Sequence, residues 1–443
     1  MKYRLYDILL HVALVLSLPF FIIKMLTVKK YREGLPERFG FIGLDKLNRL
    51  KGAPVVWFHA ISVGETKAAL PVLRLFKESH PDMKVVFSTV TMTGNRCALK
   101  ECAGLVDVVI YFPLDLSWTV RRAINRINPR ALIVVEKEIW PNMILSLSKR
   151  AVPVIIINGT LSERSFKRFI RFGFLFREVF SALSYFAART EEDCERAIKA
   201  GVDLKRAGNV GNIKYDMAPP DSTAERRAGL LSSMALSPED IVIVAGSTHK
   251  GEEEEILKAY AALATRFKRL KLVLAPRHPE RFNEAEALIK KTGIAFARRS
   301  NITHGITASA EIILLDTVGE LMNVYSIATI AFVGGSLVKG VGGHNLLEPA
   351  LHAKPVIYGK YLTTYLGMAE LLEANKGGVR VSDQASLEAA IAGLLSDSAL
   401  RARMGEAAKK AVEASRGAAK RTVSIIDGLL RLPFLKERQA KKL

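Results

Sequence analysis

Carboxylates stand where short apolar runs give way to loops, and such residues can move a proton. Glu65 lies in the stretch 57–66, WFHAISVGET, where a predicted strand passes through a glycine into a helix. A carboxylate in the first turn of a helix stays ionised beside the positive end of the helix dipole and can take a proton from an alcohol. The same residue could instead be a structural helix-start glutamate that accepts backbone amides.

A second pair of carboxylates, Glu136 and Glu138, follows the apolar run 131–135 and precedes Trp140. Alternate residues of an extended segment share a face, so these two acids beside an indole ring suit a sugar-binding floor. Lys137 allows another interpretation, a structural turn in which the lysine neutralises the acids.

Residues suited to phosphate occur in the second half of the chain. The stretch 245–249, AGSTH, follows an apolar run, and its small residues would let backbone amides approach an anion. This signal is weak, because no full GxGxxG or Walker pattern is present. Arg277, in the stretch 276–278, has planar donors for a phosphate or a pyrimidine edge, or else forms a surface salt bridge.

The densest motif is the glycine-rich stretch 332–350, in which FVGGS leads through GGHN to LLEPA. The chain there enters a predicted helix that carries Asn345 and Glu348 at its start. Backbone amides and Asn345 would meet a phosphate, while Glu348, about one turn further on, would accept hydrogen bonds from ribose hydroxyls.

Metal and disulfide chemistry are not expected. No DxD-like metal motif stands in a persuasive position, and the histidines near the phosphate motifs lie on separate loops, where hydrogen bonding is their commoner role. The cysteines form neither a CxxC pair nor a cluster with histidine, so we interpret them as buried thiols. These residues are His249, His278 and His344, and Cys97, Cys102 and Cys194.

The elements that must position these residues follow from the apolar runs. Runs rich in valine and isoleucine alternate with longer helical patterns, which is typical of parallel sheets covered on both faces. The sequence therefore predicts an α/β fold with two Rossmann-like lobes that face a cleft lined by strand ends. The expected strands are 55–59, 85–89, 108–112, 131–135 and 154–158, then, after the polar stretch 217–223, 241–245, 272–275, 312–316, 330–333 and 355–358.

Three segments are expected: an N-terminal membrane anchor over 1–28, a first lobe over 29–217, and a second lobe with terminal helices over 218–443. The run 8–23 is apolar apart from His11 and Ser17, and basic residues follow it. This order favours a retained anchor over a cleaved signal peptide and places the main body on the cytoplasmic side. A membrane span, an interfacial helix and a buried core helix are the alternatives.

A net charge of +21 over 443 residues indicates an anionic partner: nucleic acid, an acidic membrane or a phosphorylated substrate. Basic residues interleave with phenylalanines over 164–180, so a helix there would rest on lipid headgroups and attract substrate phosphates. The alternative is an amphipathic helix whose phenylalanines pack on the first lobe. No RNA-binding signature accompanies the pattern, so nucleic acid is not an expected partner. The basic residues of this surface include Arg164, Lys167, Arg168 and Arg171.

Together these stretches resemble the bacterial transferases of 3-deoxy-manno-octulosonic acid (Kdo), glycosyltransferases of the two-lobed GT-B type. The resemblance spans nearly the whole chain, and its motifs occur in the family's order. Besides the anchor, they are SVGE at 62–65, TMTG at 91–94, PLD at 113–115, EIWPN at 138–142, STH at 247–249, PRH at 276–278 and HNLLE at 344–348.

The resemblance implies an inverting transfer of Kdo from CMP-Kdo to a lipid A precursor, in lipopolysaccharide core biosynthesis at the bacterial inner membrane, with no metal or cofactor. Glu65 would be the general base, and Glu138 would assist or orient nearby. The commonest family pattern has a methionine where this chain has Val318, which keeps a backbone contact plausible. The residues that would hold CMP are Pro276, Arg277, Val318, Gly319, Glu320, Asn345, Leu346, Leu347 and Glu348.

Other function classes explain less of the sequence. A two-lobed glycosyltransferase with a UDP- or GDP-sugar donor is the nearest alternative, and competition by free nucleotides would separate the two. A Rossmann oxidoreductase would need a glycine fingerprint followed about twenty residues later by a ribose-binding acid, which is missing. A non-enzymatic basic membrane protein explains the anchor and the charge but not the polar residues at the strand ends.

Overall fold

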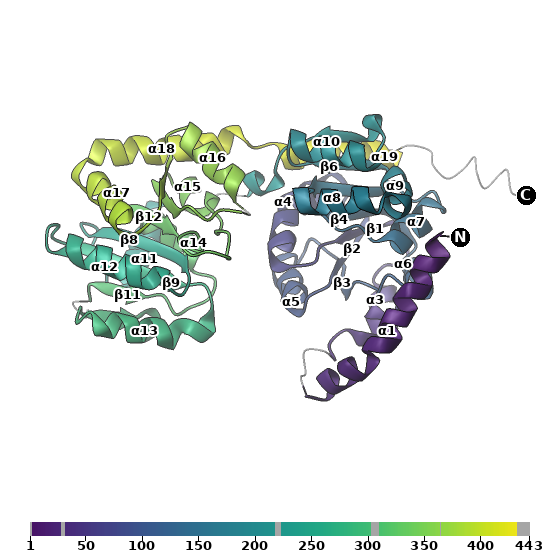
Figure 1. Cartoon of the computed structure of the whole chain (residues 1–443), viewed down its shortest axis with the longest axis horizontal. Coiled ribbons are helices and arrows are strands. Elements are labelled where there is room, and N and C mark those ends of the chain that lie inside the picture. Colours follow the sequence, from purple (N-terminus) through teal and green to yellow (C-terminus); the bar gives the residue numbers. More distant parts are fainter. Residues whose placement is uncertain (1, 28–31, 218–222, 303–309, 364, 432–443) are drawn as a thin grey trace, which may run out of the picture. The chain divides into compact units, whose positions relative to one another are not determined.

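The computed structural model of the chain describes residues 2–27, 32–217, 223–302, 310–363 and 365–431. The chain forms two compact units, the first comprising residues 1–217 together with the chain from Ser415, and the second comprising residues 218–414. Each unit has a parallel sheet flanked by helices (Figure 1). Two of the basic residues that follow the apolar run 8–23, Lys29 and Lys30, lie outside the described residues, as does most of the polar stretch 217–223.

In the described residues of the first unit, seven parallel strands stand in the order β3-β2-β1-β4-β5-β6-β7. The order reverses between β1 and β4, and ligands of open α/β sheets bind beyond the carboxyl ends of the strands at such a point. The strands are β1 (Val55–His59), β2 (Lys84–Thr89), β3 (Val108–Tyr111), β4 (Pro129–Val135), β5 (Val154–Gly159), β6 (Tyr185–Ala188) and β7 (Ala207–Asn209).

Successive residues of these strands face two separate apolar cores. Trp57 of β1 packs with helices on one face, whereas its neighbours Val56 and Phe58 pack with helices on the other. Because both faces are buried, the strands appear in the sequence as continuous apolar runs. The first face is covered by α6 (Ser117–Ile127), α7 (Pro141–Ser148), α9 (Gly173–Ser181) and α10 (Glu191–Ala200), and the second by α4 (Val63–Ser79), α5 (Met92–Glu101) and α19 (Ala418–Arg431).

The second unit repeats this plan. Its described parallel strands stand in the order β10-β11-β9-β8-β12-β13-β14, which reverses between β8 and β12. The strands are β8 (Ile241–Thr248), β9 (Leu270–Pro276), β10 (Phe296–Arg298), β11 (Ile312–Leu314), β12 (Ile330–Val333), β13 (Val356–Gly359) and β14 (Gly378–Val381). Its helices are α11 (Ala224–Ser233), α12 (Glu252–Ala264), α13 (Phe282–Lys291), α14 (Leu321–Val324), α15 (Leu347–Leu351), α16 (Leu366–Ala374), α17 (Gln384–Ser396) and α18 (Ser398–Ala414).

The predicted α/β class with two Rossmann-like lobes is confirmed, and each expected strand overlaps an observed one. Four strands were not expected, namely β6, β7, β10 and β14. Each has only three or four residues, and β7 and β14 contain glycine, so their sequences lack a strong strand pattern.

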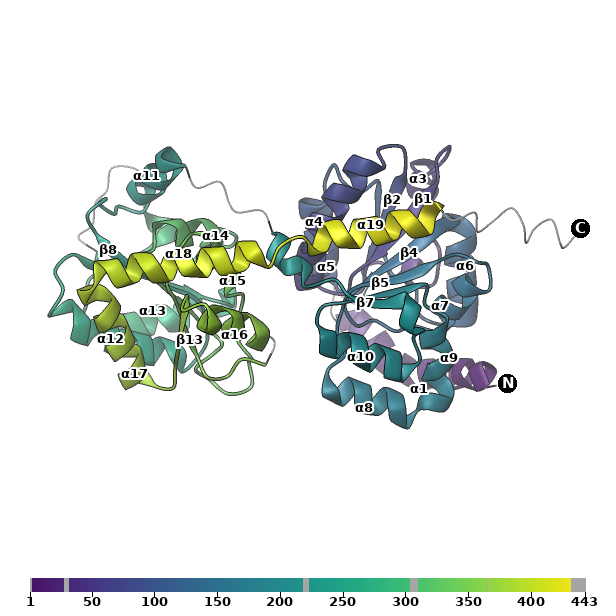
Figure 2. The same cartoon turned by 90° about the horizontal axis from the view of Figure 1, so that it is seen from above.

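The last described helix, α19, corrects the expected domain plan. The sequence analysis placed residues 218–443 in the second lobe, whereas α19 packs beside α4 in the first unit (Figure 2). Its apolar face, including Val423 and Ile426, completes the core beneath α4. The chain therefore returns to the first unit after α18.

The N-terminal helix α1 (Lys2–Thr27) contains a segment, Leu5–Thr27, with the length and mean hydropathy, 2.3, of a membrane span. Its outward side chains are exposed, with Leu16 at 76% and Leu26 at 70%. A buried core helix, one of the alternatives, is therefore excluded. Two short helices, α2 (Leu35–Arg38) and α3 (Leu44–Asn48), precede β1.

Asp216 holds the start of α19. Its carboxylate accepts hydrogen bonds from the N–H groups of Gly417 and, at 2.7 Å, Ala419. We expect Asp216→Ala to lower the Tm of the first unit by about 2–4 °C, because loss of such a cap costs about 1 kcal/mol. Thermal unfolding followed by circular dichroism measures this. Asp82→Ala, at an exposed turn residue, is the control, and an equal Tm for both variants would contradict the proposed cap.

Candidate active site

Three carboxylates lie at the carboxyl edge of the first sheet, where its strand order reverses. Glu65 is in the first turn of α4, directly after β1, and Glu136 and Glu138 follow β4, which pairs with β1. The charges of Glu136 and Glu138 both act on Glu65. The structure thus brings together acids that the sequence analysis selected in two separate segments.

Glu65 forms a capping box with Ser62 at the start of α4. The Glu65 N–H donates to the Ser62 hydroxyl, 3.5 Å away, and carboxylate oxygen Oε2 accepts from the N–H groups of Ile61 and Ser62. The helix-start role that the sequence left open is therefore present. Both amides of this cap engage Oε2, so Oε1 takes no part in the cap.

The pKa of Glu65 is raised to about 7. Burial of the side chain, which is 7% exposed, is the largest cause, and the negative charge of Glu136 adds to it, while the Ile61 amide acts in the opposite direction. A carboxyl group with a pKa near 7 can gain and lose a proton at physiological pH. Glu65 can therefore act both as a cap and as a general base.

The sequence analysis expected Glu136 and Glu138 to share one face of an extended segment, and the structure shows that they do not. Its φ of 68° is left-handed, and residues 136–137 form a turn after β4. Its carboxylate pairs with Lys214, with 2.7 Å between Nζ and Oε1. Lys214 belongs to the 3-10 turn Ile213–Asp216, so a distant lysine neutralises Glu136. The exposed Lys137 acts on Glu138, whose pKa its charge lowers against the effect of burial.

Glu138 and Trp140 complete this loop. Glu138 is half-buried, and burial raises its pKa. The Trp140 ring packs against Phe112, with centroids 5.6 Å apart, and Phe112 stacks in turn on the buried His59 at 3.8 Å. Part of the indole therefore supports the core instead of being fully free for a ligand.

Asp115 holds the first turn of α7, which follows the Glu138 loop. Sequence reasoning missed this role, although Asp115 lies in one of the family motifs. It is 5% exposed and accepts hydrogen bonds from the N–H groups of Asn142 at 3.0 Å and Met143 at 2.9 Å. Burial raises its pKa to about 7. Both of its oxygens are engaged, so Asp115 holds the start of α7, which follows Glu138.

The apolar helix α1 is joined to this edge by polar contacts. The Tyr6 hydroxyl donates to Asp115 at 3.2 Å. The Asp7 carboxylate accepts from the Ser117 N–H and hydroxyl, at 2.8 and 2.7 Å, and from the Asn142 side-chain amide at 3.0 Å. The first turns of α1 are thus fixed to the residues that position the Glu138 loop.

In the second unit, polar residues from three adjacent strands meet at the carboxyl edge. His249 follows β8, Arg277 follows β9, and His344 lies in the loop after β12. The Arg277 N–H donates to the Thr248 carbonyl at 3.0 Å, which joins the β8 and β9 loops. Pro276 and Arg277 lie at the carboxyl end of β9, where the sequence analysis placed them after a strand. Pro276 is buried, and the Arg277 side chain is exposed.

Two of the three histidines contact each other directly, which the sequence analysis did not expect of residues on separate loops. The Nε2 atoms of His249 and His344 are 2.7 Å apart, and the rings of His249 and His278 are 5.3 Å apart. Burial lowers the pKa of His249 to about 4 and that of His344 to about 3. Both rings are therefore neutral near pH 7, one donating to the other.

The stretch 345–348 lies beside this pair. The Asn345 amide donates to Glu348 at 3.3 Å and accepts from the Leu347 N–H at 3.2 Å, so it caps the start of α15. The Leu346 and Leu347 side chains are fully buried. These two leucines could meet a nucleotide only through their backbone.

The stretch 318–320 follows β11 at the same edge of the sheet. Val318 is 81% exposed, and Gly319 has a φ of 99°, in the left-handed region. Glu320 accepts hydrogen bonds from Thr317 and, at 3.3 Å, from Arg299. The three stretches selected for CMP binding therefore lie at one edge of one sheet.

Glu252 is an organising residue that sequence reasoning missed. It is fully buried at the start of α12 and accepts the N–H groups of Gly335, Ser336 and Leu337, at 2.6 to 2.9 Å, and of His249 at 2.9 Å. Burial raises its pKa, and these amides oppose the shift. Of the first glycine pair of the 332–350 motif, Gly335 therefore binds a protein carboxylate, while Gly334 donates to the Gly246 carbonyl at 2.9 Å. In the second pair, the Gly343 N–H donates to the Gly335 carbonyl at 2.7 Å, which ties the two pairs together.

Its neighbour Glu253 holds the loop that carries Arg277. The guanidinium of Arg281 contacts both Glu253 oxygens, at 2.8 and 3.1 Å, and the Thr248 hydroxyl donates to the same carboxylate at 3.0 Å. Such a bidentate contact fixes both position and orientation. Within the described residues, no group of three or more His, Cys, Asp or Glu side chains is placed to hold a metal ion.

The basic and aromatic surface over 164–180 forms α8 (Glu163–Arg171) and α9, and its phenylalanines are divided between the core and the surface. Phe169 and Phe180 pack into the core, with ring centroids 5.2 Å apart. Phe172 and Phe174, at the junction of the two helices, are 43% and 68% exposed. The basic residues named for this surface, Arg164, Lys167, Arg168 and Arg171, are exposed beside them.

Comparison with known proteins places this site in context. A family model described as 3-deoxy-D-manno-octulosonic-acid transferase (kdotransferase) matches residues 33–217. The 3-deoxy-D-manno-octulosonic acid transferase of Haemophilus influenzae is 38% identical over 409 residues, which cover 91% of this chain and 93% of that protein. The transferase of the same name from Bordetella pertussis is 32% identical and covers 89% and 91%.

Among solved structures, the UDP-GlcNAc 2-epimerase of Neisseria meningitidis bound to UDP-GlcNAc is similar, with a TM-score of 0.58 and 12% identity. The match covers 85% of this chain and 100% of that chain. At this identity the similarity supports the two-lobed fold alone.

The role of Glu252 can be tested by exchange of the backbone amides that it accepts. In Glu252→Gln the side-chain amide cannot accept all four N–H groups, so the amides of residues 335–337 should exchange with deuterium at least about tenfold faster, since an unmade buried hydrogen bond costs about 1–3 kcal/mol. Glu255→Gln, at a partly exposed position of the same helix whose side chain has no backbone N–H partner in the described chain, is the matched control. Equal exchange in both variants would mean that Glu252 does not hold the loop.

Proposed function

The chain belongs to the Kdo transferase family, whose members are glycosyltransferases, and from this premise we propose that it transfers Kdo from CMP-Kdo to a lipid A precursor, lipid IVA, in lipopolysaccharide core synthesis. The observation that carries the proposal is Glu65, a buried carboxyl group with a pKa of about 7 at the switch point of the first sheet. Such a group suits removal of a proton from a sugar hydroxyl.

In the proposed reaction the acceptor hydroxyl attacks the anomeric carbon of Kdo while Glu65 takes its proton. The bond from that carbon to the CMP phosphate breaks as the new glycosidic bond forms, and CMP leaves with the electron pair. Attack opposite the leaving group inverts the anomeric configuration. Glu138 would assist or orient the acceptor, since it lies in the loop beside Glu65.

CMP would bind at the carboxyl edge of the second sheet. Arg277 and the amides near Asn345 would stabilise negative charge that develops on the departing phosphate. Glu348 would accept hydrogen bonds from the ribose, and Pro276, Leu346 and Leu347 would contribute backbone and shape. Val318, Gly319 and Glu320 would form the remaining side of the nucleotide site.

The acceptor is an acylated, phosphorylated disaccharide, so it must be taken from a membrane. Helix α1 would hold the protein at the bacterial inner membrane, with the main body on the cytoplasmic side. The exposed Phe172 and Phe174 would enter the headgroup region, and the basic residues of α8 would attract acceptor phosphates. These residues are Arg164, Lys167, Arg168 and Arg171.

The direct test is transfer from CMP-Kdo, generated in situ, to a tetra-acylated lipid A precursor, followed by mass spectrometry of the lipid. The intact protein should add Kdo, and Glu65→Gln should be slower by about 10²–10⁴-fold, the usual contribution of a general base. Circular dichroism checks that the variant is folded, since Glu65 also caps α4. A product whose anomeric configuration, determined by NMR, is opposite to that of the donor would support inversion.

Competition identifies the donor. CMP should inhibit the transfer more strongly than UMP, UDP or GDP, and Arg277→Gln should raise the KM for CMP-Kdo more than it changes the KM for the acceptor. Stronger inhibition by UDP or GDP, with no Kdo added to the lipid, would favour the alternative of another nucleotide sugar.

The pH dependence of transfer depends on Glu65. Because the base must be ionised, kcat/KM should fall as the pH drops below about 7. The negative charge of Glu136 raises the pKa of Glu65, so Glu136→Gln should lower that pKa and move the acidic limb to lower pH by up to about one unit. Lys214→Met removes the opposite charge of the same pair and should move the limb to higher pH. If the acidic limb moved in the same direction in both variants, Glu65 would not be the group whose ionisation sets that limb.

A further inference from the structure

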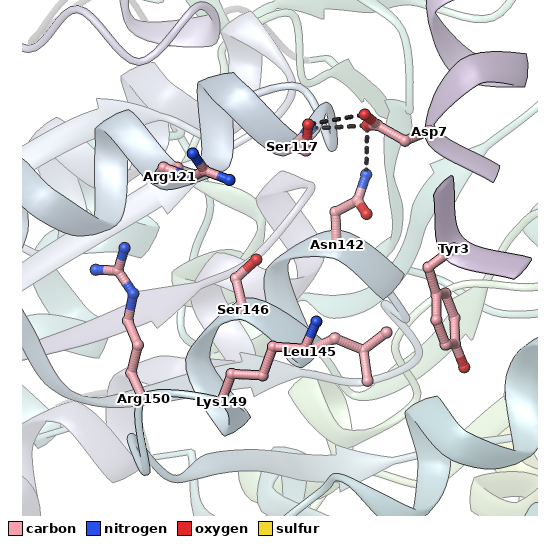
Figure 3. A pocket seen from close by; sticks show the side chains of 9 residues that line it. All are labelled: Tyr3, Asp7, Ser117, Arg121, Asn142, Leu145, Ser146, Lys149 and Arg150. Atoms are coloured by element: carbon pink, nitrogen blue, oxygen red, sulfur yellow. Dashed lines mark hydrogen bonds between the residues drawn. The ribbon is translucent and has the colours of Figure 1, made fainter. Parts of the chain in front are cut away.

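A cavity of about 450 Å³ lies in the first unit where α1 meets α6 and α7 (Figure 3). We call it the α1–α6–α7 pocket. It is separate from the residues to which the proposed reaction assigns a role. Its lining consists of Tyr3, Asp7, Ser117, Arg121, Asn142, Leu145, Ser146, Lys149 and Arg150.

Three cations line this pocket, and none of them has a counterion among the described residues. Arg121 comes from α6, and Lys149 and Arg150 come from the end of α7. Within the described chain, none of the three side chains has an ion pair or a hydrogen bond with another residue. Figure 3 shows them around the Ser146 hydroxyl. Unpaired cations that converge with a hydroxyl are suited to bind an anion.

The acid of the pocket does not cancel these charges. Asp7 accepts three hydrogen bonds from Ser117 and Asn142, drawn in Figure 3, and among the described residues its carboxylate forms no ion pair with the three cations. Three cations against one carboxylate leave a formal charge of +2. A phosphate group complements this charge.

The other side of the pocket is apolar and continues into α1. The Tyr3 ring and Leu145 form its wall, and the next turns of α1 expose Leu5, Ile8 and Leu9 at 57% to 58%. This helix has the length and hydropathy of a membrane span. A ligand that places a phosphate among the cations can therefore keep acyl chains against the same helix.

The basic surface also extends along α6. A second hollow, of about 430 Å³, is lined by Trp118, Arg122 and Arg126, and it shares Arg121 with the first. Arg122 lies over the exposed ring of Phe41 at 4.0 Å and near Trp118 at 5.3 Å. Arginine beside exposed aromatic rings is typical of a surface that meets lipid headgroups.

We propose that the α1–α6–α7 pocket binds the phosphate of an anionic phospholipid in the membrane that α1 enters. The bound headgroup neutralises Arg121, Lys149 and Arg150 and fixes the first unit against the bilayer beside α1. The site is therefore distinct from the acceptor surface on α8, and the inference does not depend on the identity of the sugar donor.

The test is binding of the full chain to vesicles by flotation, with phosphatidylcholine alone or with about 30% phosphatidylglycerol. Anionic lipid should raise the partition coefficient of the intact protein. On the same anionic vesicles, the partition coefficient of the triple variant R121Q/K149Q/R150Q should be at least about tenfold lower than that of the intact protein, since each basic residue near an anionic surface contributes about 1 kcal/mol. The matched control K258Q/R266Q/K268Q removes three exposed cations from the second unit and should retain the increase.

A second variant separates the pocket from general surface charge. Ser146→Phe keeps every cation but fills the cavity, so it should also lose most of the increase while its Tm stays close to that of the intact protein. Equal loss in the pocket and control triple variants, or no loss in either pocket variant, would overturn the proposal.

Two further measurements distinguish other occupants. If inorganic phosphate at millimolar concentration displaced the protein from anionic vesicles, at an ionic strength matched with chloride, the pocket would bind free phosphate and not a lipid. If the pocket triple variant bound vesicles normally but had a raised KM for the lipid acceptor in neutral detergent, the pocket would belong to the acceptor. Either result would overturn the assignment to a phospholipid.

Discussion

Buried carboxylates that accept backbone N–H groups hold the carboxyl edges of both sheets in place. Asp115 does so at the start of α7, and Glu252 joins the loops after β8 and β12. A buried charge is costly unless hydrogen bonds compensate for it, and these amides supply the compensation. The loops at the switch points are therefore fixed by side chains beneath them, and their outward residues can face a substrate.

Glu65 shares this arrangement but differs in how its oxygens are used. Asp115 and Glu65 both have a pKa near 7 because of burial, so the pKa alone does not identify the base. Asp115 engages both oxygens with protein donors, whereas the cap of Glu65 engages Oε2. Hydrogen bonding, and not the magnitude of the pKa shift, therefore distinguishes Asp115 from Glu65, the residue that we propose as the base.

The contacts of α1 connect membrane attachment to the same edge. Tyr6 and Asp7 bond to Asp115, Ser117 and Asn142, which hold the helices on either side of the Glu138 loop. An apolar helix could anchor a protein through a flexible linker, yet here its first turns form part of the folded unit. The position of α1 is thereby linked to that of the loop that carries Glu138.

Short-range periodicity and local caps in the amino-acid sequence are enough to predict the α/β class, most strands, the apolar N-terminal helix and the place of Glu65 at a helix start. Other features emerge from the folded chain alone: Lys214 pairs with Glu136, His249 contacts His344 across 95 residues of sequence, and Glu252 binds the glycine-rich loop. The return of α19 to the first unit is another such feature. Such contacts join residues that are close only after parallel strands align, so no local pattern encodes them.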